Sequence, residues 1–351
     1  MSGLPRRGGG RGRVANCLTR RAFLLQAASI VALAACSGST VPGARTPVRT
    51  PPRVAQVGYV AAGTPGGANT TAFLQGLADG GWVEGQNLVM QFRWGSAGTE
   101  EEFALLVREL LDLKVDVIVT VALPAARAAL QATATTPIVM ASIGDPVRNQ
   151  LVERMNRPGR NATGISIMSP QLSGKRLEYL KEALPSITRV AVLYNPSVAD
   201  MDLNWTETQN VAPQLGVELV PLRIASLGDL DGAFGLAASE HAEALLVFSD
   251  DVIFPARARI LERALAERLP TMGTQRPYAV AGALLAYGPQ YPELFRRAAA
   301  QVDMILKGAD PAVIPVEQPT RFELVANGKT AQALGITLPQ AVRLDVTEVI
   351  E

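Results

Sequence analysis

The regular alternation of apolar strands and amphipathic helices from residue 54 onward is the feature that most constrains the fold of this chain. Strands that alternate with helices predict parallel sheets covered by helices on both faces. The first series has expected strands at 54–60, 88–94, 115–121 and 137–141, with helices at 70–79, at 101–113 and from Pro124.

A second series of the same kind follows from residue 190. Its expected strands are 190–194, 217–222, 244–248 and 271–272, with helices at 205–215, 230–238 and 255–267. Two such series predict two similar α/β lobes, and 351 residues are enough for two domains with separate cores. The chain is expected to cross between the lobes at 162–167, 283–287 and 321–326. The predicted lobes are 54–162 plus 288–320, and 163–287 plus 321–351.

The first 35 residues have the features of an export signal. They hold six arginines and neither an acid nor a lysine, and an apolar run from Phe23 to Ala35 follows Arg20 and Arg21. This run is too short to span a bilayer, which takes about 20 apolar residues. A basic start and a small-residue end are typical of a secretory signal. The twin arginines resemble the signal of the folded-protein (Tat) route, and general secretion is the alternative.

The apolar run ends at Leu33-Ala34-Ala35-Cys36, which resembles a bacterial lipobox. We therefore expect Cys36 to be lipidated and to become the mature N-terminus; an ordinary cleaved signal with an incidental cysteine is the alternative. Residues 36–53 are rich in Pro, Gly, Ser and Thr, which predicts a disordered tether. The expected location is extracytoplasmic, with the lipid in a membrane.

Composition argues against several kinds of function. Without the leader arginines, 27 basic residues remain against 32 acidic ones, and a mildly acidic body is poorly suited to nucleic acid. Cys17 and Cys36 both precede the body, and His241 is the one histidine. Neither a disulfide framework nor a Cys/His zinc site is predicted, and we expect no metal and no cofactor.

Catalytic motifs are also not found. The glycines of 63–67 lack the spacing of a dinucleotide loop, and Ser173-Gly174-Lys175-Arg176 lacks the upstream glycine of a phosphate-binding loop. His241 has no nucleophile-elbow sequence with which to form a triad. We therefore expect no catalytic residues and a protein that is not an enzyme.

Candidate ligand-binding residues follow from the position of strand ends, because ligands of open parallel sheets bind beyond the carboxyl ends of the strands. Asp250 suits a ligand ammonium, and a tyrosine could stack on an apolar or aromatic group. Backbone amides at helix starts near Pro124 and Pro146 could hold a carboxylate. The rule selects Tyr59, Ser142, Asp145, Tyr194, Asn195, Ser249, Asp250, Gln275 and Arg276.

Each candidate has a structural alternative. Asp145 and Asp250 could instead cap helices, since aspartate is a favoured N-cap. Asn195 precedes Pro196 and could belong to a turn. Tyr59 and Tyr194 could pack at their strand ends, and Arg276 could be an exposed charge.

Seven stretches of the body resemble the ABC-transporter substrate-binding family that includes tryptophan- and tyrosine-type binding lipoproteins. They are GWVEGQN (81–87), KVDVIV (114–119), GDPV (144–147), LSGKRLE (172–178), RVAVLYNP (189–196), ILKGA (305–309) and PVEQPTRFELV (315–325). The resemblance implies a type I periplasmic-binding-protein fold, with two Rossmann-like lobes, three crossovers and a ligand between the lobes. This chain departs from the family at 121–124, where relatives often carry Gly-Thr-Pro or Ala-Thr-Pro.

The resemblance also implies a function and partners. A monomeric binding protein would deliver a small molecule, an amino acid and preferably an aromatic one, to an ABC permease and its ATPase. A ligand-sensing lipoprotein that reports to a membrane receptor without transport is the alternative. The missing hydroxyl at 121–124 leaves the identity of the ligand open.

Overall fold

The computed structural model describes residues 54–63, 65–95, 99–198 and 201–351. The expected signal peptide (1–35), the tether (36–53) and the lipidation site Cys36 lie outside the described residues. No helix within the described ranges has the length and apolar composition needed to cross a membrane.

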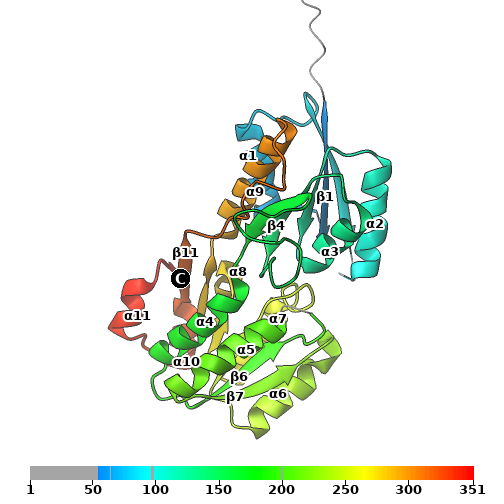
Figure 1. Ribbon diagram of the computed structural model, residues 1–351. Coiled ribbons are helices and arrows are strands. Elements are labelled where there is room, and N and C mark those ends of the chain that lie inside the picture. Colours follow the sequence, from blue (N-terminus) through cyan, green and yellow to red (C-terminus); the bar gives the residue numbers. More distant parts are fainter. Residues whose placement is uncertain (1–53, 64, 96–98, 199–200) are drawn as a thin grey trace, which may run out of the picture. The chain divides into compact units, whose positions relative to one another are not determined.

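The first sheet has five parallel strands in the order β2-β1-β3-β4-β5 (Figure 1). Its central strand β3 reads VIVTV, and its first four residues are buried because helices cover the sheet on both faces. The strands are β1 (Ala55–Ala62), β2 (Leu88–Gly95), β3 (Val117–Val121), β4 (Ile138–Ile143) and β5 (Ala162–Ser166).

Helices α1 and α9 pack together on one face of this sheet, and α2 and α3 cover the other (Figure 1). The close approach of α1 and α9 requires Gly76, because a Cβ at this position would lie 2.8 Å from the Cβ of Ala299. The helices are α1 (Ala68–Asp79), α2 (Glu100–Asp112), α3 (Leu123–Ala132) and α9 (Tyr291–Leu306).

The second sheet has seven strands in the order β12-β11-β10-β9-β8-β6-β7. The run from β7 to β10 is parallel, whereas β11 is antiparallel to β10 and parallel to β12. The strands are β6 (Arg189–Tyr194), β7 (Glu218–Arg223), β8 (Ala244–Val247), β9 (Thr271–Gly273), β10 (Leu285–Pro289), β11 (Phe322–Asn327) and β12 (Glu348–Ile350).

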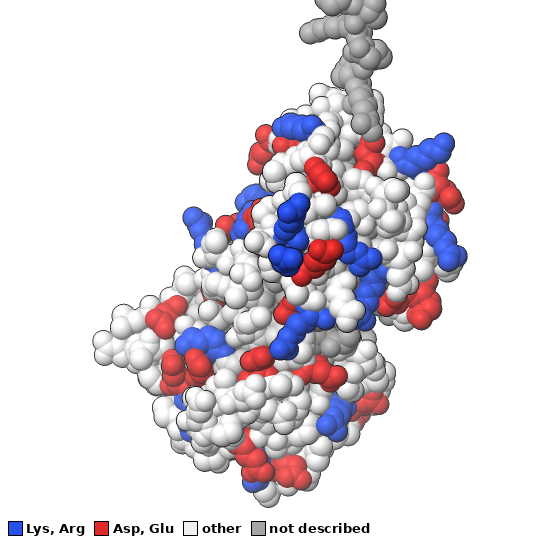
Figure 2. Space-filling model, in the orientation of Figure 1, with Lys and Arg blue, Asp and Glu red and all other residues white. Residues whose placement is uncertain are grey.

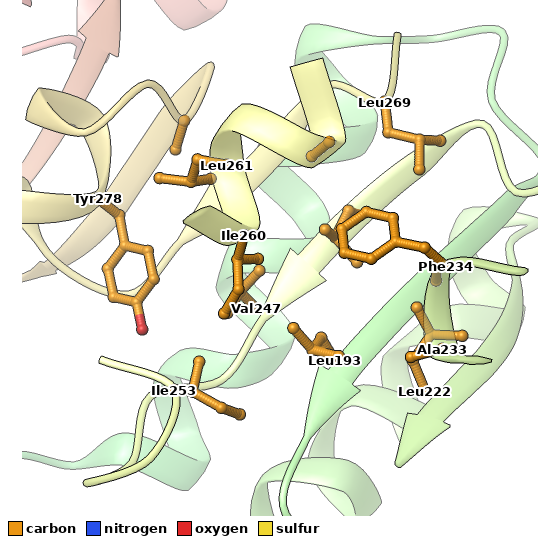
Figure 3. Close-up of a cluster of buried hydrophobic side chains, with 14 of the residues drawn as sticks. Leu193, Leu222, Ala233, Phe234, Val247, Ile253, Ile260, Leu261, Leu269 and Tyr278 are labelled. Carbon is orange, nitrogen blue, oxygen red and sulfur yellow. The ribbon is translucent and has the colours of Figure 1, made fainter. Parts of the chain in front are cut away.

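Each face of the second sheet has its own hydrophobic core. On one face, side chains of α6, α7 and α8 pack against β6, β7 and β8, with Phe234, Ile260 and Tyr278 among them (Figure 3). On the other face, α4, α5 and α11 contribute Leu177, Met201 and Val342. The helices are α4 (Ser169–Ala183), α5 (Met201–Val211), α6 (Leu230–Ser239), α7 (Arg257–Ala266), α8 (Arg276–Val280), α10 (Gly328–Leu334) and α11 (Gln340–Asp345), with 3₁₀ turns η1 (Ala212–Leu215) and η2 (Leu227–Asp229).

The predicted α/β fold with two lobes is confirmed, and both sheets are parallel as predicted except where β11 pairs with β10. The helix expected at 205–215 begins earlier, at Met201, and its last turn is 3₁₀ around Pro213, which has no N–H for an α-helical bond. The antiparallel β11 was not anticipated.

Three segments connect the two sheets. The chain leaves the first sheet after β5, returns to it between β10 and α9, and joins the second sheet again at β11. The expected boundary at residue 162 lies at the start of β5, a strand of the first sheet, so the first passage follows Ser166. The sequence of β5, ATGIS, is too short and too weakly apolar to predict this boundary.

Candidate ligand-binding site

A cavity of about 1260 Å³ lies where the carboxyl ends of strands from both sheets meet. In each sheet the strand order reverses beside the first strand of its series: β1 lies between β2 and β3, and β6 between β7 and β8. Such switch points leave a crevice at the strand ends, which is the usual ligand site of open α/β sheets. We call this cavity the cleft. A hollow of about 290 Å³ on α6 and α7 lies away from it.

Seven of the nine candidate residues line the cleft. They are Tyr59, Ser142, Asn195, Ser249, Asp250, Gln275 and Arg276. Arg276 also forms a two-pronged ion pair with Glu348, with both N–O distances 2.7 Å, and its side chain is 46% exposed. Its charge is therefore largely satisfied within the protein.

Tyr194 does not line the cleft; instead it packs in the core of the second lobe. Its ring stacks on Trp205 with centroids 5.3 Å apart, and its hydroxyl accepts a hydrogen bond from Arg223 Nε at 3.0 Å. The register of β6 directs this side chain toward α5. The structure therefore agrees with the alternative interpretation of Tyr194, in which its side chain packs at the end of its strand.

Asp145 also lies outside the cleft lining. Its Oδ1 accepts hydrogen bonds from the backbone N–H groups of Val147 and Arg148, at 3.1 and 3.0 Å. These bonds close turns, and residues 146–150 do not form the helix that was expected to start near Pro146. No helix N-terminus is therefore available there for a carboxylate.

A cluster of aromatic rings lies at the first-lobe wall of the cleft, where Tyr59 and Trp94 are among the lining residues. The ring of Tyr59 lies 5.4–5.7 Å from those of Phe73, Phe92 and Trp94, and Phe92 and Trp94 are stacked. Burial raises the pKa of Tyr59 to about 12, so its hydroxyl stays neutral. Trp94 is half-buried and faces the cleft. The sequence analysis missed Trp94, although it is the last residue of the strand expected at 88–94 and lies next to the end of β2.

Asp250 is both a turn cap and an incompletely bonded carboxylate. Its Oδ1 accepts hydrogen bonds from the N–H groups of Val252 and Ile253, at 2.8 and 2.6 Å. Its Oδ2 is buried and has no partner that meets hydrogen-bond geometry, although Asn195 lies beside the carboxylate. Burial raises the pKa of Asp250. The neighbouring Asp251 is exposed to solvent in the cleft, but its pKa is still raised to about 6. Partial burial by the surrounding protein is the larger cause, and repulsion by the charge of Asp250 is the smaller one.

Several other buried polar atoms at the second-lobe side of the cleft also lack a hydrogen-bond partner. They are Arg176 Nη1, Arg257 Nε and Thr274 Oγ1, and all three residues line the cleft. The Tyr278 hydroxyl, which does not line the cleft, points toward the segment of Ile253 in Figure 3 and lies beside Ser249. Buried polar groups are nearly always bonded, so a concentration of unbonded ones at a cavity indicates a site for a polar ligand or for water.

Ala122 has an unusual backbone conformation at the entrance to α3. Its φ of 70° and ψ of 164° fall in a region that residues with a side chain rarely adopt. Ala122 and Pro124 line the cleft, so the start of α3 does face the cavity, as expected. Strain of this kind is concentrated at ligand sites.

Charges of both signs are interspersed on the face of the molecule seen in Figure 2. The cleft itself is lined by both arginines and acids, including Arg176, Arg257, Asp250 and Asp251. Among the described residues, no three His, Cys, Asp or Glu side chains come together as a metal site would require.

The two sheets, the connecting segments and the cleft at the strand ends define a two-lobed binding protein of the type I periplasmic class. The sequence matches the family model described as "ABC transporter substrate binding protein" over residues 67–350. The chain belongs to this family, whose members bind solutes outside the cytoplasm and are not enzymes.

Individual relatives agree with this assignment. The chain is 26% identical over 263 residues to a tyrosine-binding protein of Clostridioides difficile (strain R20291), covering 75% of each chain. A conserved domain protein from Vibrio cholerae has 29% identity and a TM-score of 0.79, over 85% of this chain and 100% of the other. A Streptococcus protein solved in complex with L-Trp has 25% identity and a TM-score of 0.76, over 84% and 99%.

Proposed function

We propose that this protein is the solute-binding lipoprotein of an ABC importer and that its ligand is an amino acid with an aromatic side chain. The ligand lies in the cleft, with its side chain against the first lobe and its polar end against the second. The protein catalyses no reaction and passes the ligand to a permease that an ATPase drives.

The observation that carries this proposal is the division of the cleft into an aromatic wall and a polar wall. Trp94 offers a half-buried ring on the first-lobe side, and the buried ring of Tyr59 packs behind it. Asp250 offers a buried carboxylate oxygen without a partner on the other side. An aromatic amine complements both walls, because rings pack on rings and an ammonium satisfies a desolvated carboxylate. The related proteins that bind tyrosine or contain L-Trp support the same ligand class.

The first 53 residues support a location of the protein outside the cytoplasm, anchored to a membrane. The Arg20-Arg21 signal and Leu33-Ala34-Ala35-Cys36 support export and lipidation at Cys36, with residues 37–53 as a tether between lipid and body. Cys36→Ser should release the protein from membranes or leave it as an unprocessed precursor. A variant that stays membrane-bound at the mature size would contradict the anchor.

A thermal-shift screen tests the ligand class. The purified protein is heated with each of the twenty amino acids, with nucleosides and with small sugars. A ligand present at 100 times its Kd stabilises the folded state by about 2.7 kcal/mol, which gives a clear rise in Tm. We expect the largest rises with tryptophan, tyrosine or phenylalanine. A rise with sugars or nucleosides alone would contradict the proposed ligand.

Transport is tested separately from binding. Deletion of the gene should reduce uptake of the identified ligand, and a plasmid copy should restore it. Unchanged uptake together with a lost transcriptional response to the ligand would indicate the sensing role instead.

A further inference from the structure

Arg176 is a fully buried cation beside the cleft. It lies on α4 between Leu172 and Leu180, each four residues away, so helical periodicity places it on the face of α4 that packs inward. Its exposed fraction is 2%. The apolar neighbours at this spacing are the sequence signal by which Arg176 could have been recognised as a buried arginine.

The hydrogen bonds of Arg176 leave its charge uncompensated. Nε donates to the backbone carbonyl of Tyr287 at 2.8 Å, and Nη2 lies 3.5 Å from the carbonyl of Thr274. Nη1 has no partner, and within the described part of the chain no carboxylate forms an ion pair with this guanidinium. Burial lowers the pKa of Arg176 to about 10, which still leaves it charged at neutral pH. A buried charge without a counter-ion is costly to the folded state.

The surroundings of Arg176 provide a second donor and room for a ligand group. Thr274, at the end of β9, has a buried hydroxyl without a partner, and both residues line the cleft. Gly288 allows β10 to approach the backbone of Thr274 closely, because a Cβ there would lie 2.1 Å from the Thr274 carbonyl oxygen. A guanidinium and a hydroxyl together match the two oxygens of a carboxylate.

We propose that Arg176, with Thr274, forms an anion subsite that binds the carboxylate of the ligand. The inference rests on the proposed function and adds the group that the ligand must carry. Asp250 Oδ2 and Arg176 Nη1 are both unpaired and belong to the same lobe, so the second lobe alone offers complementary charges to both ends of a zwitterion.

The subsite also lies next to the segments that connect the lobes. Arg176 follows the first connection by ten residues, and Tyr287, whose carbonyl it bonds, belongs to the strand that precedes the second. A carboxylate bound here would therefore lie close to the segments that connect the lobes, and lobes joined in this way commonly close around a ligand by a hinge.

The first test uses ligand analogues on the wild-type protein. L-tryptophan and L-tyrosine are titrated by calorimetry beside tryptamine and tyramine, which lack the carboxylate, and beside the two amino-acid amides, in which it is neutral. Loss of one partner of a desolvated charge pair predicts affinities at least about 30-fold weaker for the amines and amides. Equal affinity of an acid and its amide, or binding of uncharged solutes only, would overturn the anion subsite.

Two variants then assign the effect to Arg176. In Arg176→Met, the preference for L-tryptophan over tryptamine should fall to nearly 1, whereas Arg176→Lys should keep part of it. Arg189→Gln is the matched control, because it removes a positive charge from the same lobe. Arg189 begins β6, at the end of this strand away from the cleft, and pairs with Glu218. This variant should keep the full preference for L-tryptophan.

The outcomes separate this inference from the proposed function. If tryptophan binds but Arg176→Met weakens tryptophan and tryptamine equally, Arg176 has a structural role only and the subsite is wrong while the function stands. If the wild-type protein binds no amino acid but binds other carboxylates through Arg176, the ligand class is wrong and the subsite stands. Failure of every carboxylate to bind would overturn the subsite.

Discussion

The Oδ1 atom of Asp250 lies 2.6 Å from the backbone nitrogen of Ile253 and accepts its hydrogen bond. The same carboxylate therefore stabilises the turn before α7 and keeps its other oxygen free at the cleft. Capping and ligand contact, the two alternatives considered for Asp250, are compatible because each uses a different oxygen.

Asp250→Asn should separate these two roles. Asparagine caps about as well as aspartate, so Tm should change little. Affinity for an amine-bearing ligand should fall at least about 30-fold, because the ligand ammonium loses its counter-ion. Calorimetric titration beside a melting curve gives both quantities. Wild-type affinity in this variant would mean that another group holds the ammonium.

The pH dependence of stability should reflect the raised pKa values of Asp250 and Asp251. A carboxyl group whose pKa is higher in the folded state binds its proton more tightly there, so the contribution of this group to stability is greatest in acid and is lost as pH rises toward the folded-state value. For Asp251 this loss should occur between about pH 4, the usual aspartate range, and about pH 6.

Melting curves from pH 4 to pH 7 check this expectation. Asp251→Asn should flatten the decline of Tm over this range. Asp229 should have the opposite effect on stability, because backbone hydrogen bonds from Ser226 and Ala225 lower its pKa. Asp229→Asn should therefore be less stable than the wild-type protein at neutral pH. A decline in Tm that Asp251→Asn leaves unchanged would show that Asp251 does not contribute to it.

Ala122→Gly should stabilise the ligand-free protein. Glycine adopts the backbone angles of Ala122 without strain, and relief of this strain stabilises the folded state by about 1–3 kcal/mol. The greater entropy of the unfolded chain with glycine offsets about 0.4–1 kcal/mol of this gain. The expected net gain in unfolding free energy is about 1 kcal/mol. Ala104→Gly, within α2, is the control and should cost about 1 kcal/mol. Destabilisation by both changes would show that Ala122 is not strained.

Two tryptophans distinguish the cleft wall from the core. Trp94→Ala should weaken an aromatic ligand about 10-fold, because stacking is worth about 0.5–1.5 kcal/mol beyond the buried area. Trp205→Ala removes the partner of Tyr194 and should cost about 3 kcal/mol of stability with little change in Kd. Equal loss of affinity in both variants would mean that the cleft wall has no direct contact with the ligand.

The fold could be predicted from sequence largely because its central strands, such as β3 and β6, are mostly buried. Runs such as 117–121 and 190–194 are mainly apolar, and amphipathic helices separate such runs, which leaves few architectures. The antiparallel β11 was not predictable in this way, because an apolar run does not show the direction in which a strand pairs.

The site was predicted less completely, for identifiable reasons. The strand-end rule located Asn195, Ser249 and Asp250 at the cleft but could not decide which way Tyr194 points. Arg176 comes from a helix rather than a strand end, so the rule did not reach it. Trp94 lies near the end of β2 but was not considered as a candidate ligand-binding residue.

Calorimetric titration of the purified protein with L-tryptophan and L-tyrosine tests the central claim most directly. The account predicts one site per chain with a Kd in the micromolar range or tighter, and the loss of binding when Trp94 and Asp250 are replaced together by Ala and Asn. The absence of heat and of thermal stabilisation with every amino acid, or binding that the double replacement leaves unchanged, would contradict it.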